Sequence, residues 1–138
     1  MLKRIRENII ALISVLIAVS ALFYSTWRLE VTEENRNIRI ASFESLRTLT
    51  DLQLLIDYAY YDKDAERGNP IKGWSYVIYV NDLSETISPD VKIKSDKLYQ
   101  SWQEHWKNIS TQTEAQKAIT SIIAQTRESI LAAMKSLD

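Results

Sequence analysis

The chain contains no cysteine, and only two glycines, two prolines and one histidine occur among its 138 residues. The absence of cysteine excludes a disulfide framework and any thiolate metal or redox site. Glycine and proline are the strongest breakers of regular structure, so their scarcity indicates long helices joined by few turns. We therefore predict an all-α fold.

The sequence also lacks the groups of polar residues that mark an active site. Its only histidine, His105, falls on an apolar helical face, where a packed side chain is a simpler interpretation than a base or ligand that needs convergent partners. Asp62, Asp64 and Glu66 alternate as at the start of a calcium loop, but the glycine and ligand spacing of an EF-hand does not follow. We predict a protein that is not an enzyme, with no metal site and no cofactor.

One long uncharged run contrasts with this scarcity of features. It extends from Ile9 to Trp27 and reads IIALISVLIAVSALFYSTW. At about 1.5 Å per residue, a helix of this length crosses a hydrocarbon core of roughly 30 Å. We predict a transmembrane helix over residues 9–27, preceded by a basic cytoplasmic tail over residues 1–8 and followed by an extracytoplasmic domain over residues 28–138.

The charges around this run predict its orientation. Three basic residues precede it and acidic residues soon follow it, which places the N-terminus in the cytoplasm by the positive-inside rule. The expected location is the cytoplasmic (inner) membrane, single-pass, with a periplasmic domain if the source is bacterial. A cleaved secretory signal is the alternative, because the small residues of Val19-Ser20-Ala21 suit a cleavage site before Leu22. Both interpretations place residues 28–138 outside the cytoplasm.

Helical periodicity organises the domain after the run. Residues 28–37 are mostly polar and predict an exposed stalk. The first helix is expected to continue to about Asp62, because the following residues recur at helical spacing on one inward face: Ile38, Ala41, Ser42, Ser45, Leu49, Leu52, Ile56 and Ala59. Residues 62–73 have the composition of a loop. About 50 Å of helix would separate this loop from the membrane, so the loop is predicted to be membrane-distal.

Three further helices are expected to complete an antiparallel bundle of about four helices. Residues 74–87 are rich in strand-preferring types, but no second strand exists to pair with them, so we predict a helix with Tyr76, Val80, Leu83 and Ile87 facing inward. Ser88 before Pro89 predicts the cap of the third helix. Thr111 and Glu114 predict a capping box at the start of the last helix.

Aromatic residues gather between the end of the first helix and the third helix. On a helical wheel, the tyrosines at 58, 60 and 61 point in different directions, so one core cannot take them all. Tyrosine and tryptophan are enriched in binding hot spots, although large rings can also simply fill a wide core. The predicted partner- or ligand-binding residues are Tyr58, Tyr61, Trp74, Tyr76, Tyr79, Trp102 and Trp106.

Small residues recur along the predicted span at spacings of three and four. Such a stripe lets helix backbones approach closely, and its serines can hydrogen-bond across the contact. The predicted packing face consists of Ala11, Ser14, Ala18, Ala21 and Ser25. Its expected partners, besides the lipid bilayer, are another membrane protein or a second copy of this chain.

These features predict a non-enzymatic, single-pass membrane protein that acts as a subunit, scaffold or adaptor through its span and its aromatic distal end. The alternative is a sensor-like module that binds a small extracytoplasmic ligand or protein and relays to a membrane partner; the predicted bundle resembles the outer sensor bundles of bacterial transmembrane receptors. Residues 28–138 carry 14 basic and 17 acidic side chains, a charge near −3 (14 minus 17). This mild, mixed charge argues against binding to nucleic acid.

Overall fold

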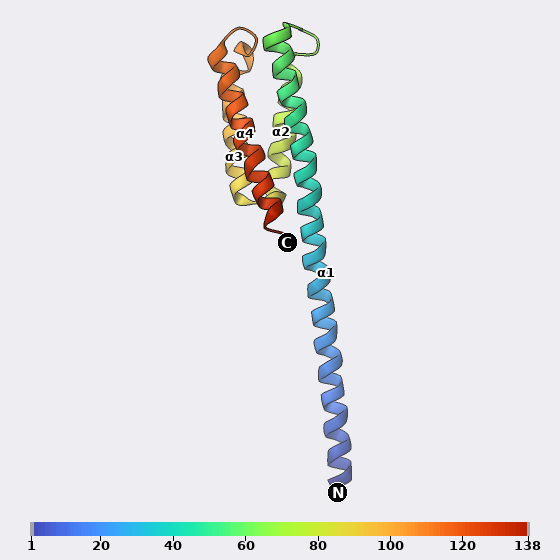
Figure 1. Cartoon of the computed structure of the whole chain (residues 1–138). Helices are drawn as coiled ribbons and strands as arrows, with labels where there is room; N and C mark the ends of the chain where they lie inside the picture. Colours follow the sequence, from blue (N-terminus) through green and yellow to red (C-terminus); the bar gives the residue numbers. More distant parts are fainter. Residues whose placement is uncertain (1, 138) are drawn as a thin grey trace. The chain divides into compact units, whose positions relative to one another are not determined.

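The computed structural model describes residues 2–137 of the chain, and the side chains of residues 8–137. That part is helical and contains no strand, which confirms the predicted all-α class. The helices are α1 (Leu2–Asp57), α2 (Pro70–Ile87), α3 (Pro89–His105) and α4 (Thr113–Lys135), shown in Figure 1. A π-helical turn, η1 (Tyr58–Asp62), follows α1, and a 3-10 turn, η2 (Trp106–Asn108), follows α3. The chain divides into two compact units, Met1–Arg36 and Asn37–Asp138.

The first unit consists of the N-terminal part of α1. All of residues 9–27 are exposed, including every apolar side chain of the run. This is the one helix in the described part that is long and apolar enough to cross a membrane, although a signal sequence meets the same criterion. Two hydroxyl groups within the run form hydrogen bonds inside the helix: Ser14 Oγ donates to the Ile10 carbonyl at 2.9 Å, and Thr26 Oγ1 donates to the Leu22 carbonyl at 3.0 Å.

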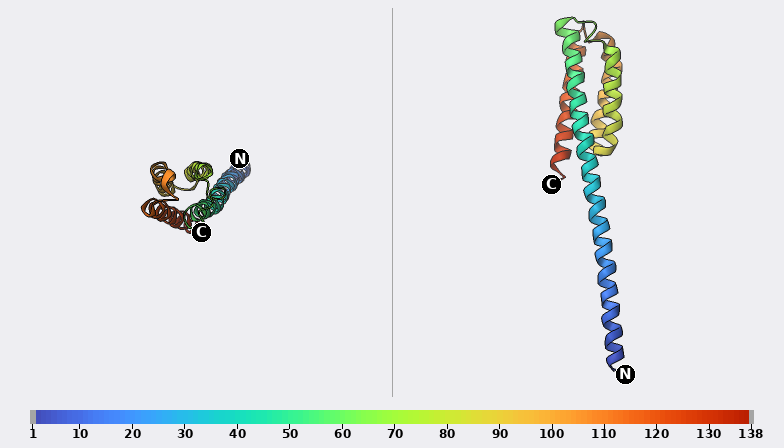
Figure 2. Two further views of the ribbon diagram at one scale, coloured as in Figure 1. Left: turned by 90° about the horizontal axis from the view of Figure 1, so that it is seen from above. Right: turned by 90° about the vertical axis from the view of Figure 1, so that its right-hand side faces the viewer.

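The second unit contains a four-helix bundle made by the rest of α1 with α2, α3 and α4 (Figure 2). Contacts between α1 and α4 show that these two helices run antiparallel. Gln53 Nε2 donates to Thr120 Oγ1 at 3.3 Å, whereas Arg127, further along α4, donates to the carbonyl of Leu46, earlier in α1, at 2.9 Å. The η1–α2 loop and the η2–α4 loop therefore lie at one end of the bundle, which we call the tip, and the α2–α3 turn lies at the other.

The predicted inward face of α1 is confirmed, with seven of its eight residues buried and Ile38 half-buried. Large apolar side chains fill the core along its whole length, such as Ile56 and Trp102 near the tip and Ile130 toward the α2–α3 turn. The end near that turn also contains buried serines, which are Ser42, Ser45, Ser84 and Ser129. The hydroxyls of Ser42 and Ser45 have no hydrogen-bond partner.

The ambiguous segment 74–87 is helical, as predicted, but α2 begins earlier, at Pro70, so the loop is shorter than residues 62–73. Asn69 caps α2 by accepting a hydrogen bond from the Ile71 amide at 3.0 Å. The predicted inward face is confirmed, because Val80 and Ile87 are buried, and Tyr76 and Leu83 are half-buried and packed against the core. The buried residues of α2 are Gly73, Val77, Val80, Ser84 and Ile87. Hydrophobic patterning overlooks Gly73 and Ser84, whose small size lets a neighbouring helix approach.

The two predicted helix caps have different outcomes. Ser88 caps α3 as expected, since its side chain accepts a hydrogen bond from the Val91 amide at 3.2 Å. The capping box of Thr111 and Glu114 is wrong. Helix α4 starts at Thr113 after Gln112, which makes no side-chain cap, and the Thr111 hydroxyl donates instead to the Asn108 carbonyl. That bond belongs to the turn after η2, which leaves Thr111 outside the helix it was expected to cap.

Candidate functional site

The η1–α2 loop at the tip has a fixed conformation built around Asp64. The backbone before it turns through Lys63, whose φ of 56° is left-handed. The Asp64 carboxylate accepts hydrogen bonds from the amides of Glu66 at 3.0 Å and Arg67 at 2.9 Å, and from Arg67 Nε at 2.7 Å. The Arg67 amide and guanidinium lower the pKa of Asp64, so the carboxylate is charged at neutral pH.

Gly68 lets this loop pack closely against η1. A Cβ atom at Gly68 would lie 2.4 Å from the backbone nitrogen of Ala59 and 2.7 Å from the carbonyl oxygen of Asp64. Only glycine allows two backbone segments to come this close. The loop therefore forms a packed cover over η1.

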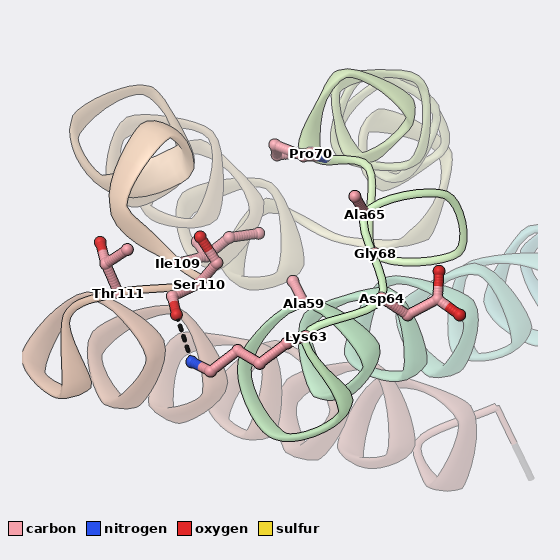
Figure 3. Close-up of a pocket in the computed structure, with 9 residues that line it drawn as sticks. All are labelled: Ala59, Lys63, Asp64, Ala65, Gly68, Pro70, Ile109, Ser110 and Thr111. Atoms are coloured by element: carbon pink, nitrogen blue, oxygen red, sulfur yellow. Dashed lines mark hydrogen bonds between the residues drawn. The ribbon is translucent and has the colours of Figure 1, made fainter.

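A cavity of about 500 Å³ opens beneath this cover. Figure 3 shows that its lining comes from η1 and its loop on one side and from the turn before α4 on the other. The lining residues are Ala59, Lys63, Asp64, Ala65, Gly68, Pro70, Ile109, Ser110 and Thr111. Lys63 Nζ donates to the Ser110 carbonyl, which joins the two sides, while the Asp64 carboxylate points away from the other lining side chains (Figure 3). The cavity thus combines apolar walls with an ammonium group and two hydroxyls, a composition that suits a small, partly apolar ligand.

None of the seven predicted aromatic residues lines this cavity. Instead, three rings form an aromatic cluster of Trp74, Tyr99 and Trp106, contributed by α2, α3 and η2. The ring centroids of Trp74 and Tyr99 are 5.6 Å apart and those of Trp74 and Trp106 are 6.2 Å apart, both in edge-to-face geometry.

The tyrosines at the end of α1 have separate roles. Tyr58 lies under the Arg67 guanidinium, 4.1 Å from the ring centroid. Tyr60 is half-buried, and its hydroxyl shares a hydrogen bond of 2.7 Å with Thr113 Oγ1. Tyr61 is 66 % exposed and packs edge to face on Tyr60, with 4.9 Å between the ring centroids. Of the three, Tyr61 offers the most ring surface to a partner.

The remaining predicted site residues differ in their exposure. Trp102 is fully buried and belongs to the core, so its ring is not accessible to a partner. Tyr76 is half-buried on α2, whereas Tyr79 is exposed on the same helix. The predicted packing residues of the span are all exposed on α1.

The cavity residues Lys63, Ser110 and Thr111 were missed by the sequence analysis. Ser110 is 47 positions from Lys63, and no spacing rule links a loop lysine to a turn so distant in the sequence. The left-handed conformation of Lys63 also leaves no mark in the sequence, since glycine or asparagine is the usual residue there.

We predict that Tyr60→Ala destabilises the bundle and that Tyr61→Ala does not. The first substitution removes a packed ring and the hydrogen bond to Thr113, and should cost about 1–3 kcal/mol, whereas exposed positions usually change stability by about 0.5 kcal/mol or less. Thermal unfolding followed by circular dichroism measures both. Tyr60→Phe is the matched control and should lose only about 0.5–1.5 kcal/mol. Equal melting temperatures for the two alanine variants would contradict this assignment.

The chain has no match among protein-family models, curated proteins or solved structures. Across the described residues, no three or more histidine, aspartate or glutamate side chains gather as a metal site.

Proposed function

We propose that this is a non-enzymatic, single-pass membrane protein that acts as a subunit, scaffold or adaptor. The observation that carries the proposal is that every one of residues 9–27 on α1 is exposed. Exposure of these mainly apolar residues to water is unfavourable. Their transfer into lipid is favourable by a free energy of about 25 cal/mol per Å² of apolar surface. The proposed orientation has the N-terminus in the cytoplasm and the bundle outside, in the periplasm of a bacterial cell, because basic residues precede the span.

The tip is the proposed contact for an extracytoplasmic partner. Tyr61 is exposed next to the packed loop, and the aromatic cluster of Trp74, Tyr99 and Trp106 lies at the same end of the bundle. Exposed rings such as Tyr61 and Tyr99 beside a packed base that includes half-buried Trp74 and Trp106 are typical of binding hot spots, because such rings lose little conformational entropy when they are buried.

The absence of cysteine allows a clean test of the topology. We expect Glu66→Cys to react with a membrane-impermeant maleimide added to intact cells or spheroplasts, and Lys3→Cys to react only after the membrane is permeabilised. The reverse pattern would refute the orientation. A mature protein that begins at Leu22 would refute the anchor and support the cleaved signal.

The partner contact is tested by purification of the full chain in mild detergent from its own cells. A protein that copurifies with the native chain should be lost with Tyr61→Ala and retained with Gln125→Ala, an exposed substitution on α4. If the partner copurifies equally well with the native chain and with Tyr61→Ala, the proposed contact at the tip is wrong.

A second function, binding of a small extracytoplasmic ligand, is favoured by the cavity at the tip. Its volume of about 500 Å³ lies within the usual range for ligand sites. Native mass spectrometry of the purified chain should then detect a retained small molecule, and Ala65→Trp, which fills the cavity from its rim, should abolish retention. If the native chain and the Ala65→Trp chain retain the small molecule equally, the cavity is not its binding site.

A further inference from the structure

The cavity at the tip contains one charged group that reaches across it. Lys63 extends from the end of η1 to the opposite wall, where its ammonium group donates to the Ser110 carbonyl (Figure 3). The other charged lining residue, Asp64, turns its carboxylate away and accepts hydrogen bonds from the Glu66 and Arg67 amides and from the Arg67 guanidinium. The charge of Asp64 is already balanced by Arg67, so Lys63 supplies the charge that a molecule in the cavity meets.

The Lys63 ammonium group can take a further, negatively charged partner. The two groups in contact with it are neutral: the Ser110 carbonyl, and the face of the Tyr60 ring, whose centroid lies 4.8 Å from Nζ. In the part of the chain that the structure describes, no aspartate or glutamate oxygen lies within ion-pair distance of Nζ. An ammonium group has three N–H donors, and Ser110 takes one of them. Two donors and the positive charge thus remain for a ligand.

The backbone holds this lysine in place before a ligand binds. Lys63 has the left-handed φ of 56°, and its amide donates to the Tyr58 carbonyl. The Asp64 amide donates to the same carbonyl at 3.0 Å. Lys63 is therefore fixed both at its backbone and at its ammonium group. Little conformational entropy is lost when an anion binds to a side chain that is already ordered.

The remaining walls are mainly apolar, and they define the rest of the ligand. Ala59 and Ile109 form the buried part of the lining. Ala65 and Pro70 add further apolar surface. A ligand whose anionic group reaches Lys63 must therefore place an apolar body against these walls. The volume of about 500 Å³ limits this body to a small molecule.

We infer that the cavity at the tip binds a small apolar carboxylic acid, with its carboxylate on Lys63 and its hydrocarbon body against Ala59 and Ile109. This inference rests on the proposed ligand-binding function and adds the chemical class of the ligand. One ammonium group balances one negative charge, which favours a carboxylate over a dianionic phosphate. An α-amino acid is disfavoured, because its own ammonium group needs an acceptor and the carboxylate of Asp64 faces away.

A matched set of fluorinated probes tests the inference by fluorine NMR, with the full chain in mild detergent. We expect para-fluorophenylacetate to bind about fivefold more tightly than para-fluorophenylacetamide, its neutral analogue of the same shape. That ratio is the upper end of the range for an exposed ion pair. The zwitterion para-fluorophenylalanine should bind no more tightly than the amide. Equal affinity for the acid and the amide, tighter binding of the amino acid, or no binding of the acid would overturn the inference.

Lysine variants test whether the charge that selects the acid is that of Lys63. Lys63→Met keeps the length of the side chain and should lower the affinity for the acid about fivefold, with little effect on the amide. Lys63→Arg keeps the charge and should retain the preference for the acid. Lys107→Met is the matched control, since Lys107 lies over the Trp106 ring at the same end of the bundle and outside the lining. Equal losses in Lys63→Met and Lys107→Met would refute the assignment to Lys63.

The cavity-filling variant Ala65→Trp distinguishes failure of this inference from failure of the proposed ligand site. It should abolish the binding of para-fluorophenylacetate. If the native chain binds the acid and the amide equally and Ala65→Trp binds neither, the cavity is a ligand site but the choice of a carboxylic acid is wrong. If the acid binds equally to the native chain and to Ala65→Trp, the cavity is not the site, and the proposed ligand-binding function is wrong as well.

Discussion

Replacement of Trp102 by alanine should destabilise the bundle more than any other single truncation described above. Trp102 is the largest of the fully buried side chains. Truncation of a buried tryptophan typically costs about 3–5 kcal/mol, through lost burial and through the cavity that remains. The total free energy of unfolding of a domain of this size is about 5–15 kcal/mol. Much of the folded population of the Trp102→Ala chain should therefore be lost near physiological temperature.

Thermal unfolding of the full chain in mild detergent, followed by circular dichroism, measures this effect. Tyr79→Ala is the matched control, since it removes an aromatic ring that is 44 % exposed and should cost about 1 kcal/mol or less. Trp102→Phe should lower the free energy of unfolding far less than Trp102→Ala. The indole N–H of Trp102 is buried without a hydrogen-bond partner, so its removal offsets part of the lost packing. Equal melting temperatures for Trp102→Ala and Tyr79→Ala would contradict the buried position of Trp102.

We expect Gly73→Ala to lower stability, which is the opposite of its usual effect in a helix. Alanine normally gains about 0.5–1 kcal/mol over glycine within a helix. At position 73, however, the added Cβ would lie 2.1 Å from Cζ2 and 2.4 Å from Cη2 of Trp102. Overpacking of this kind costs about 1–3 kcal/mol, so the net change should be destabilising by about 1–2 kcal/mol.

A double-mutant cycle shows whether Trp102 causes this loss. In the Trp102→Phe chain the smaller ring leaves space, so Gly73→Ala should be neutral or stabilising there. Ser75→Ala, at an exposed position of the same helix, is the matched control and should raise stability slightly through helix propensity. If Gly73→Ala raises the melting temperature of the native chain, the close approach of α2 to Trp102 is wrong.

Much of the fold could be predicted because periodicity and breakers dominate this sequence. The inward face of α1 was found from apolar and small residues at helical spacing, and the Ser88–Pro89 pair located the start of α3. The tertiary environment explains what failed. Asn69 and Pro70 were assigned to a loop by their composition, although the same two residues form a strong helix start once Asn69 accepts from the Ile71 amide.

The candidate site was less predictable, because its geometry depends on contacts between distant segments. Trp102 and Trp74 are both aromatic residues on helices, yet Trp102 is fully buried, whereas Trp74 is half-buried at the edge of the core, in the cluster with Tyr99 and Trp106. What separates them is Gly73, which makes space for the Trp102 ring in the core. A single-residue property such as aromaticity cannot distinguish these two environments.

The serines in the core near the α2–α3 turn lower the local stability of that end of the bundle. Each buried serine contributes less transfer free energy than the leucines and isoleucines near the tip, and the Ser42 and Ser45 hydroxyls add the cost of unmatched polar groups. Local opening should therefore begin at the serine-rich end and spread toward the tip. Amide hydrogen exchange should then be slower near the tip than at the serine-rich end of the bundle.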